Sequence, residues 1–284
     1  MTVAEAPGVD DAAFERYAGK NGYFSMIFDF GWENMEGEND KSSIHAVERW
    51  KKKMFTHVAH NSRIGWSAIF LENHDQSRCL NKFLERENIS FYSASALASI
   101  YFFLYGTPFI YQGQEIGMTN VKWKNINDMD DIRAKRTYEE AVGQGKDPDE
   151  VLAYFSELGR DNARTPMQWD DSENGGFTCG KPWIKCNDNY RTINAQSEVN
   201  DPDSLYNYYK RLIQCYHDHA DIVRQAEFRP MYEEYPGLFA YEREVNGKGL
   251  LVIVNFTNEK LMFQKIDQKC VLCNYHETES EWLQ

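Results

Sequence analysis

Strand-like and helix-like segments alternate from the start of the chain to Tyr111, and this pattern constrains the fold more than any other feature. Short apolar runs typical of buried strands lie at Thr2–Glu5, Phe24–Phe30, Trp66–Leu71 and Pro108–Tyr111. The segments between them predict helices over Asp11–Tyr17, Ser43–Phe55 and Ser93–Leu104. This alternation predicts a parallel sheet. Because a closed (β/α)8 barrel needs eight strands and about 250 residues, the pattern predicts an α/β fold with half of a TIM barrel.

After Tyr111 the chain divides into an insertion, a helix and a small β region. The insertion, about 121–200, breaks the alternation, and only Asp147–Leu158 within it favours a helix. An amphipathic helix is predicted over Asp201–His219, and the turn signal Asn246-Gly247 between apolar runs predicts a β-hairpin. We therefore expect a partial barrel domain over residues 1–223, with four βα units and the insertion. A β-sandwich-like domain that lacks its last strands is expected over 224–284.

Charge and hydropathy exclude several classes of partner. The formal net charge is -13 and no Lys/Arg cluster is interleaved with aromatic residues, so no nucleic-acid partner is expected. The densest basic run, Arg49–Lys53, lies where apolar residues recur at helical spacing, which is typical of the solvated side of an amphipathic helix. No apolar run approaches the roughly 20 residues of a membrane span, so no membrane partner is expected.

The sequence predicts a cytoplasmic protein without a cofactor. It does not begin with a charged segment followed by an apolar stretch, as a secretory signal would. Its six cysteines are scattered, which fits reduced thiols better than a disulfide framework. Cys270 and Cys273 form a CxxC in a strand-like apolar run, but no second CxxC and no histidine cluster accompany them. We therefore expect no metal site.

Two acidic residues lie just past strand-like runs. Glu5 ends the first run, and Asp75 follows the run that ends at Leu71. The carboxyl ends of parallel strands form the active-site face of a barrel, so both carboxylates are expected there. Aromatic residues make up 14% of the chain, a share that suits stacking on sugar rings but equally suits an ordinary large core.

Several motifs, in order along the chain, resemble the α-amylase superfamily of glycoside hydrolases. The sequence FLENHDQSR at 70–78 resembles the fourth signature region of that superfamily, and TVAEAPG at 2–8 resembles the third. Four further segments resemble the oligo-1,6-glucosidase and α-glucosidase branch of that superfamily. They are TPFIYQGQEIGMTN at 107–120, DNARTPMQW at 161–169, Pro182–Ile184 and Asn189-Tyr190. The resemblance covers nearly the whole chain. It implies the carboxy-terminal half of a (β/α)8 barrel, with its last four βα units, followed by a small antiparallel β domain.

The resemblance implies retaining hydrolysis of α-glucosidic bonds in short oligosaccharides. That reaction uses a nucleophilic carboxylate and a second, acidic carboxyl group about 5–5.5 Å away. By resemblance Glu5 is the catalytic acid, and His74 and Asp75 hold the hydroxyls of the sugar next to the cleaved bond. Asp75 is counted as catalytic because its contacts can tighten in the transition state. Arg78 and Arg164 are implied as substrate-binding groups near the same sugar, with a structural ion pair as the alternative for both.

The family's nucleophilic aspartate has no counterpart in this chain. In the family it lies before the acid, and the first family region and a loop that binds calcium in many relatives are missing as well. We therefore expect the isolated chain to be inactive. Since a half-barrel exposes an edge strand and an apolar face, the chain is expected to need the amino-terminal half of the barrel as a partner.

The substrate stays open from the sequence. Gln114 stands where relatives often have Glu, and Ser77 where they often have Pro. The residue that helps set linkage preference follows the absent nucleophile, so α-1,6 and α-1,4 bonds are not distinguished. Trehalose-6-phosphate hydrolases and sucrose-acting relatives share most of the motifs. A non-catalytic glycosidase-like module for binding or assembly is the alternative of another class: the absent nucleophile favours it, whereas Glu5 and Asp75 in their motifs argue against it.

Overall fold

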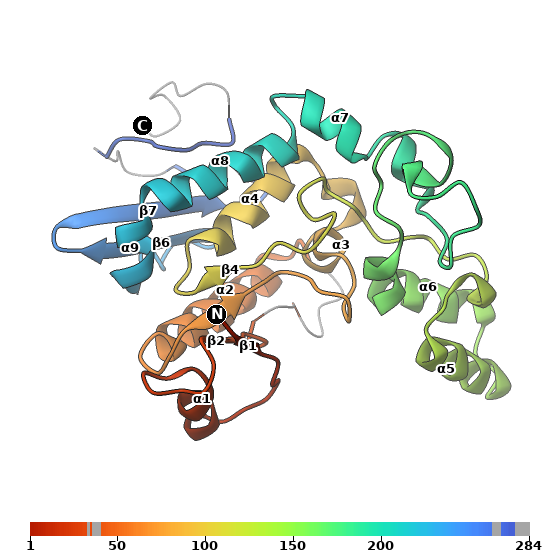
Figure 1. The fold of residues 1–284 in the computed structure, drawn as a ribbon, viewed down its shortest axis with the longest axis horizontal. Helices are drawn as coiled ribbons and strands as arrows, with labels where there is room; N and C mark the ends of the chain where they lie inside the picture. Colours follow the sequence, from red (N-terminus) through yellow and green to blue (C-terminus); the bar gives the residue numbers. More distant parts are fainter. Residues whose placement is uncertain (33–34, 36–40, 263–267, 276–284) are drawn as a thin grey trace. The chain divides into compact units, whose positions relative to one another are not determined.

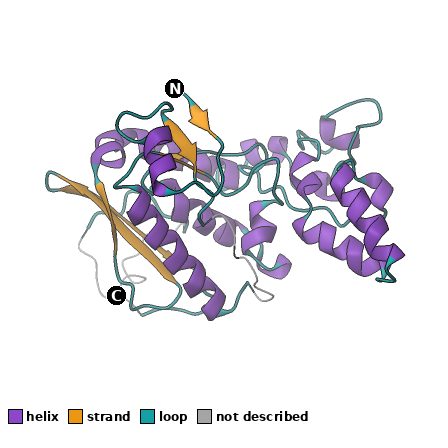
Figure 2. Ribbon diagram, turned by 90° about the horizontal axis from the view of Figure 1, so that it is seen from below, coloured by secondary structure: helices purple, strands orange, loops and turns teal. Residues whose placement is uncertain are grey.

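The structure is a computed structural model that describes residues 1–32, 35, 41–262 and 268–275. These residues form two compact units. Unit one comprises Met1–Phe70, Ser90–Phe109 and Tyr208–Gln284, and unit two comprises Leu71–Ile89 and Ile110–Asn207. Both sheets belong to unit one, whereas unit two is built from helices and loops (Figures 1 and 2).

The elements are labelled as in Figure 1. The strands are β1 (Val3–Ala4), β2 (Met26–Phe28), β3 (Ser67–Ile69), β4 (Thr107–Pro108), β5 (Glu227–Pro230), β6 (Leu238–Val245) and β7 (Lys248–Asn255). The α-helices are α1 (Asp11–Ala18), α2 (Ile44–Asn61), α3 (Cys79–Phe83), α4 (Phe91–Phe102), α5 (Ile132–Gly143), α6 (Pro148–Leu158), α7 (Ala195–Asn200), α8 (Leu205–Asp218) and α9 (Ala220–Gln225).

The first sheet confirms the predicted parallel arrangement. Its order is β1-β2-β3-β4, and each neighbouring pair is parallel. The strands are shorter than the apolar runs that predicted them. Next to β2, for example, Thr2 and Ser25 each donate a backbone N–H to the other's hydroxyl at 3.0 Å. These side-chain contacts add to the backbone bonds that Ser25 and Met26 donate to the carbonyl of Thr2 at 3.1 and 3.3 Å.

Two long helices of unit one follow from their sequences. Val47, Trp50, Met54 and Val58 are buried at helical spacing, which carries α2 beyond the predicted end at Phe55 to Asn61. Helix α4 begins with a capping box, in which the side chains of Ser90 and Ser93 each accept the other's backbone N–H. The helix buries residues on most of its sides, as its Ala- and Leu-rich sequence predicts.

The second sheet is antiparallel, with order β5-β6-β7. The predicted hairpin is present: Asn246 and Gly247 turn the chain between β6 and β7 with φ of 53° and 74°. Strand β5 was not predicted. Within the described residues this region has one sheet rather than the two of a sandwich. Because residues after 224 share a unit with the parallel sheet, the expected domain boundary there does not coincide with the division into units.

Aromatic and charged side chains attach the antiparallel sheet to the helices of unit one. The rings of Trp50 in α2 and Phe239 in β6 are 5.0 Å apart. Arg243 in β6 is fully buried and donates hydrogen bonds to the backbone carbonyls of Phe103, Leu104, Val223 and Ala226. Burial lowers the pKa of Arg243. One guanidinium therefore donates hydrogen bonds to backbone carbonyls at the C-terminal ends of both α4 and α9.

Unit two corrects the prediction of a mostly irregular insertion. Helix α6 was predicted and begins with Asp147 as its N-cap and Pro148 in its first turn. Helix α5 was missed because its sequence is polar overall, and of its few apolar residues only Ala134 is buried. The two helices share a core formed by Val121, Trp123, Met129, Ala134, Val151, Leu152, Phe155 and Ile184.

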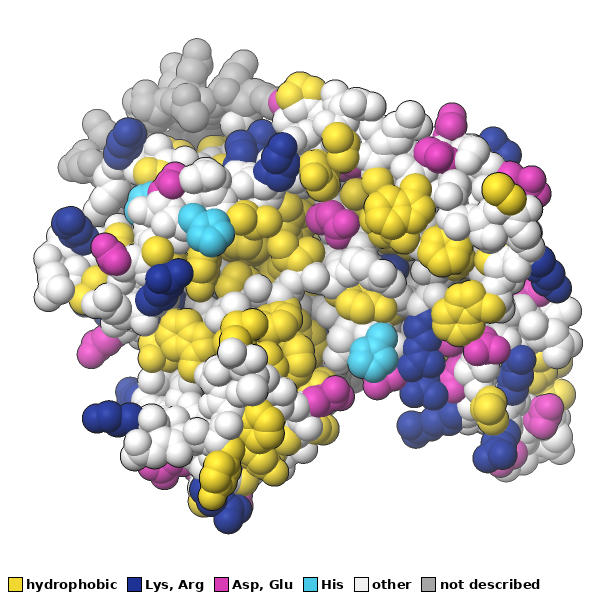
Figure 3. All heavy atoms as spheres, in the orientation of Figure 1, with side chains coloured by type: hydrophobic (Ala, Val, Ile, Leu, Met, Phe, Trp, Pro, Cys, Tyr) yellow, Lys and Arg dark blue, Asp and Glu magenta, His cyan; other side chains and the backbone are white. Residues whose placement is uncertain are grey.

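Aromatic rings cluster beside the parallel sheet: Phe70 is buried, whereas Phe28 and Phe109 are partly buried. Phe28 lies 5.5 Å from Phe70 and 5.0 Å from Phe109, measured between ring centroids. Hydrophobic side chains reach the surface around this sheet (Figure 3).

The prediction for the cysteines has a mixed outcome. All six thiols are free, but Cys270 and Cys273 lie in a segment without a strand.

Candidate active site

Glu5 follows directly on β1, and its side chain is exposed. The chain then turns at Gly8, with φ of 73°, and enters α1, where Asp10 caps the helix by accepting the N–H of Ala13 at 2.8 Å. Within the part of the chain that the structure describes, no hydrogen bond or ion pair holds the Glu5 carboxylate. Glu5 belongs to unit one and the other four predicted site residues to unit two. Its role as the acid stays a prediction.

Three of the predicted residues meet in unit two. Oδ1 of Asp75 accepts hydrogen bonds from Nη2 of Arg164 at 2.5 Å and from Nη1 of Arg160 at 3.2 Å. Arg164 also donates from Nε to the backbone carbonyl of His74 at 2.7 Å. The His74 ring lies on the other side of the carboxylate, with Nε2 3.4 Å from Oδ2. His74 and Asp75 remain exposed, so the group can meet a ligand.

Arg160 was not predicted, although it immediately precedes the motif at 161–169 and lies on the same 3-10 turn as Arg164, η3 (Arg160–Arg164). Its Nε and Nη2 donate to Oδ2 and Oδ1 of Asp131 at 2.7 and 2.8 Å. This hydrogen bonding from Arg160 is the main cause that lowers the pKa of Asp131. Asp131 is the N-cap of α5 and accepts the N–H of Arg133 at 2.9 Å. The guanidinium thus links α5 to Asp75.

Arg78 makes the structural ion pair that the sequence left open, and the geometry gives no support to the predicted sugar contact. Its side chain is fully buried, and Nη1 lies 3.0 Å from Oε1 of Glu72. The same nitrogen donates to the carbonyl of Gln112 at 2.7 Å. Oε2 of Glu72 accepts the N–H of Cys79 at 2.5 Å. A guanidinium enclosed in this way fixes the loop that carries Asp75 and is not open to a sugar.

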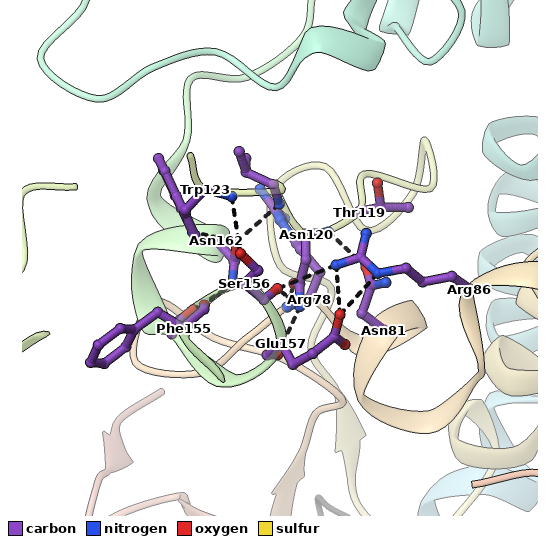
Figure 4. Close-up of polar contacts among 12 residues, drawn as sticks. Arg78, Asn81, Arg86, Thr119, Asn120, Trp123, Phe155, Ser156, Glu157 and Asn162 are labelled. Atoms are coloured by element: carbon purple, nitrogen blue, oxygen red, sulfur yellow. Dashed lines mark hydrogen bonds and ion pairs between the residues drawn. The ribbon is translucent and has the colours of Figure 1, made fainter. Parts of the chain in front are cut away.

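Two asparagines connect the segments behind this loop (Figure 4). Asn120 accepts the backbone N–H of Arg78 at 2.9 Å and donates to the carbonyls of Ser156 and Glu157 at the end of α6. Asn162 accepts from the backbone of Val121 and donates to carbonyls near the end of α6. Because both side chains are buried, these bonds hold the loop at 71–78 and the turn that carries Arg160 and Arg164 in one framework.

One more acidic residue at a strand end, Asp29, was not singled out from the sequence. Asp29 follows β2 and is buried. Its Oδ1 lies 2.7 Å from Nε2 of His57 and accepts the N–H of Gly31 at 3.0 Å. The signal in the sequence was an aspartate inside an apolar run. A buried strand rarely contains a carboxylate that lacks a partner. The group belongs to unit one, as Glu5 does.

The residues described contain no group of three His, Cys, Asp or Glu side chains arranged to hold a metal ion. Among those same residues, no helix is both long enough and apolar enough to cross a membrane.

Comparison with known proteins identifies related sequences and folds. The family described as "Alpha amylase, catalytic domain" matches residues 1–226. An oligo-1,6-glucosidase from Parageobacillus thermoglucosidasius is 38% identical over all of this chain and 52% of its own length. The chain therefore spans about half the length of the curated relatives it matches.

Solved structures agree with this result. The crystal structure of a trehalose-6-phosphate hydrolase from Bacillus licheniformis matches with a TM-score of 0.85 at 32% identity, over 98% of this chain and 52% of the other. An isomaltulose synthase from Protaminobacter rubrum matches with a TM-score of 0.80 at 33% identity, over 93% of this chain and 48% of the other. The predicted family is confirmed, as are a partial α-amylase-type fold and a small antiparallel sheet.

Proposed function

Because the chain belongs to the α-amylase catalytic-domain family, we propose that it supplies the carboxy-terminal half of the active site of an exo-acting, retaining α-glucosidase. Its proposed substrates are short α-linked glucosides of the oligo-1,6-glucosidase type. The observation that carries the proposal is the exposed carboxylate of Asp75, held by Arg160 and Arg164 on one oxygen and flanked by His74 on the other. This arrangement suits hydrogen bonding to adjacent hydroxyls of one sugar ring.

In the proposed mechanism Asp75 accepts hydrogen bonds from the hydroxyls of the reacting sugar. These bonds strengthen as the ring gains positive charge toward the oxocarbenium-like transition state, so they lower the barrier as well as aid binding. Glu5, exposed at the end of β1, protonates the leaving oxygen and later activates water. The nucleophilic carboxylate comes from an amino-terminal half of the barrel, which we propose as the partner of this chain in a cytoplasmic enzyme.

The test is complementation with the amino-terminal half of an oligo-1,6-glucosidase, assayed on isomaltose and on an aryl α-glucoside. Glu5→Gln should reduce turnover of isomaltose much more than turnover of the aryl glucoside, because an activated leaving group departs with little protonation. Asp75→Asn should slow both substrates to a similar degree, because its contacts are to the sugar they share. Glu15→Gln, at an exposed glutamate on α1, is the matched control and should change neither rate.

Two outcomes would contradict the proposal. Turnover by the isolated chain, well above that of its Glu5→Gln variant, would mean that the chain contains its own nucleophile. Equal loss ratios for Glu5→Gln and Asp75→Asn on the two substrates would mean that the separate roles are wrong. If the assembly binds isomaltose without hydrolysing it, the non-catalytic alternative replaces the enzymatic one.

A trehalose-6-phosphate hydrolase is the second candidate, and the similarity to the Bacillus licheniformis enzyme favours it. The same assembly, assayed with trehalose 6-phosphate beside isomaltose, separates the two. Preference for the phosphorylated disaccharide, lost at high salt, would indicate that cationic groups at the rim of the pocket bind its phosphate.

A further inference from the structure

Lys82 is a buried, charged side chain to which the proposed mechanism gives no task. It belongs to α3, the short helix that directly follows the loop at 71–78. Because helical side chains lean toward the N-terminus of their helix, a long side chain on α3 can reach back to that loop. Nζ of Lys82 donates to the backbone carbonyl of Leu71 at 2.5 Å and to Oε1 of Gln76 at 2.7 Å. One ammonium thus bridges the two ends of the loop.

The bonds within the loop shape its turn and leave the tip exposed. The side chain of Asn73 accepts the N–H of Asp75 at 2.8 Å, and its carbonyl accepts the N–H of Gln76 at 3.3 Å. The side chains of His74 and Asp75 remain 59% and 43% exposed. The contacts of Lys82 are of another kind, because they cross the base of the turn and join the residues before and after it.

The charge of Lys82 and the shape of the loop depend on each other. A buried ammonium is costly unless it is hydrogen-bonded, and its bonds to carbonyl oxygens are charge-assisted. The ring of Phe83 adds a favourable contact, with its centroid 5.1 Å from Nζ. Movement of Leu71 or Gln76 away from Nζ would remove an acceptor from the buried charge. The ammonium therefore resists changes in the separation of the two loop ends.

We propose that Lys82 is a positioning residue that ties Leu71 to Gln76 and so fixes the loop that presents His74 and Asp75. It acts from below the loop and does not touch the sugar. Without its ammonium the ends of the loop are free to move apart, and the turn between them samples other shapes. The consequence for catalysis rests on the proposed function, whereas the tie itself is a property of the chain alone.

Hydrogen exchange of the chain tests the tie directly. Lys82→Met keeps an unbranched apolar side chain but removes the ammonium, so we expect the amides of residues 72–77 to exchange at least about 10-fold faster. Helices α5 and α6 should keep the rates of the parent. Unchanged exchange at 72–77 would overturn the proposal. Faster exchange throughout unit two would overturn it as well, since Lys82 would then stabilise the whole unit rather than the loop.

A second variant tests the same tie from its other end. Gln76→Met leaves Lys82 in place and removes one acceptor, so exchange at 72–77 should rise by a smaller factor than in Lys82→Met. The double variant should exchange no faster than Lys82→Met alone, because both changes break one contact. If Lys82→Met does not fold, Gln76→Met decides, and unchanged exchange overturns the proposal. Gln144→Met, at an exposed glutamine that caps the end of α5, is the matched control and should leave the loop unchanged.

Kinetics in the complemented assembly test the effect on the site. Lys82→Met should lower kcat by roughly 10-fold on both isomaltose and the aryl glucoside, with a smaller change in KM, because Asp75 contacts the sugar that the two substrates share. Gln144→Met should change neither rate. If exchange at 72–77 rises but kcat is unchanged, the positioning role is wrong. If the parent assembly has no turnover, the proposed function fails, and hydrogen exchange still decides whether Lys82 fixes the loop.

Discussion

Replacing Arg78 with methionine is expected to destabilise unit two by about 3–5 kcal/mol. The side chains of Arg78 and Glu72 are both fully buried, and their Nη1 and Oε1 atoms are 3.0 Å apart. Without the guanidinium, Oε1 of Glu72 loses its ion-pair partner, whereas Oε2 keeps the N–H of Cys79. The carbonyl of Gln112 loses its hydrogen bond as well. The cost therefore comes mainly from a buried charge left without its partner.

The double variant Arg78→Met with Glu72→Gln isolates that cause. Both charges are then removed, and the amide oxygen of Gln can still accept the N–H of Cys79, so we expect a cost of about 1–2 kcal/mol from the remaining unpaired carbonyl. Arg86→Gln is the exposed comparison: it breaks the pair with Glu157, at 31% and 41% exposure, and should cost no more than about 1 kcal/mol.

Urea unfolding followed by tryptophan fluorescence measures all of these variants. The double variant should be more stable than Arg78→Met alone, because a compensated pair has been replaced by neutral groups. If Arg78→Met costs less than about 1 kcal/mol and instead abolishes sugar binding, the burial argument is wrong. Arg78 would then reach the ligand, as the family resemblance implied.

Three further predictions concern other parts of the chain. Arg243→Leu should cost about 3–5 kcal/mol in urea unfolding, because buried carbonyls at two helix ends lose their donor; a cost below about 1 kcal/mol would contradict this. Gly247→Ala should cost about 1 kcal/mol from its positive φ alone, since no atom lies within 4 Å of the added Cβ; a much larger loss would mean that the hairpin turn is packed. The lowered pKa of Asp131 contributes stability that is present above the unfolded value of about 3.9 and is lost as pH falls through the folded value. Asp131→Asn should therefore lose less stability than the parent in acid, and parallel pH profiles would contradict the shift.

The fold of unit one was largely predictable because its core signals are local. Each strand of the parallel sheet overlaps an apolar run, although β4 shares only Pro108 with its run, and the Asn246-Gly247 turn identified the hairpin. Helix α5 was not predicted, because its sequence is mostly polar and only one of its residues is buried. Its position depends instead on Asp131, whose partner Arg160 is distant in sequence. Contacts of this kind leave no periodic pattern.

The motifs predicted part of the candidate site. His74, Asp75 and Arg164 were identified from motifs and do meet, whereas Arg78 forms the buried ion pair that the sequence had left open as the alternative. A motif records which residue type stands at a position and carries no information about its burial. Arg160 lay one residue outside the motif that contains Arg164, so the resemblance did not include it.

Three arginines near the loop that carries Asp75 differ in how far their side chains are buried, and this difference predicts different roles for them. The side chains of Arg78, Arg164 and Arg160 are 0%, 23% and 36% exposed. A guanidinium without exposure acts only on the fold, because no ligand reaches it. One that is partly exposed and bonded to an exposed carboxylate is close enough to the ligand site to affect binding and turnover. Loss of Arg78 should therefore appear mainly as reduced stability and loss of Arg160 mainly as reduced turnover, while Arg164, which also holds the backbone at His74, should affect both.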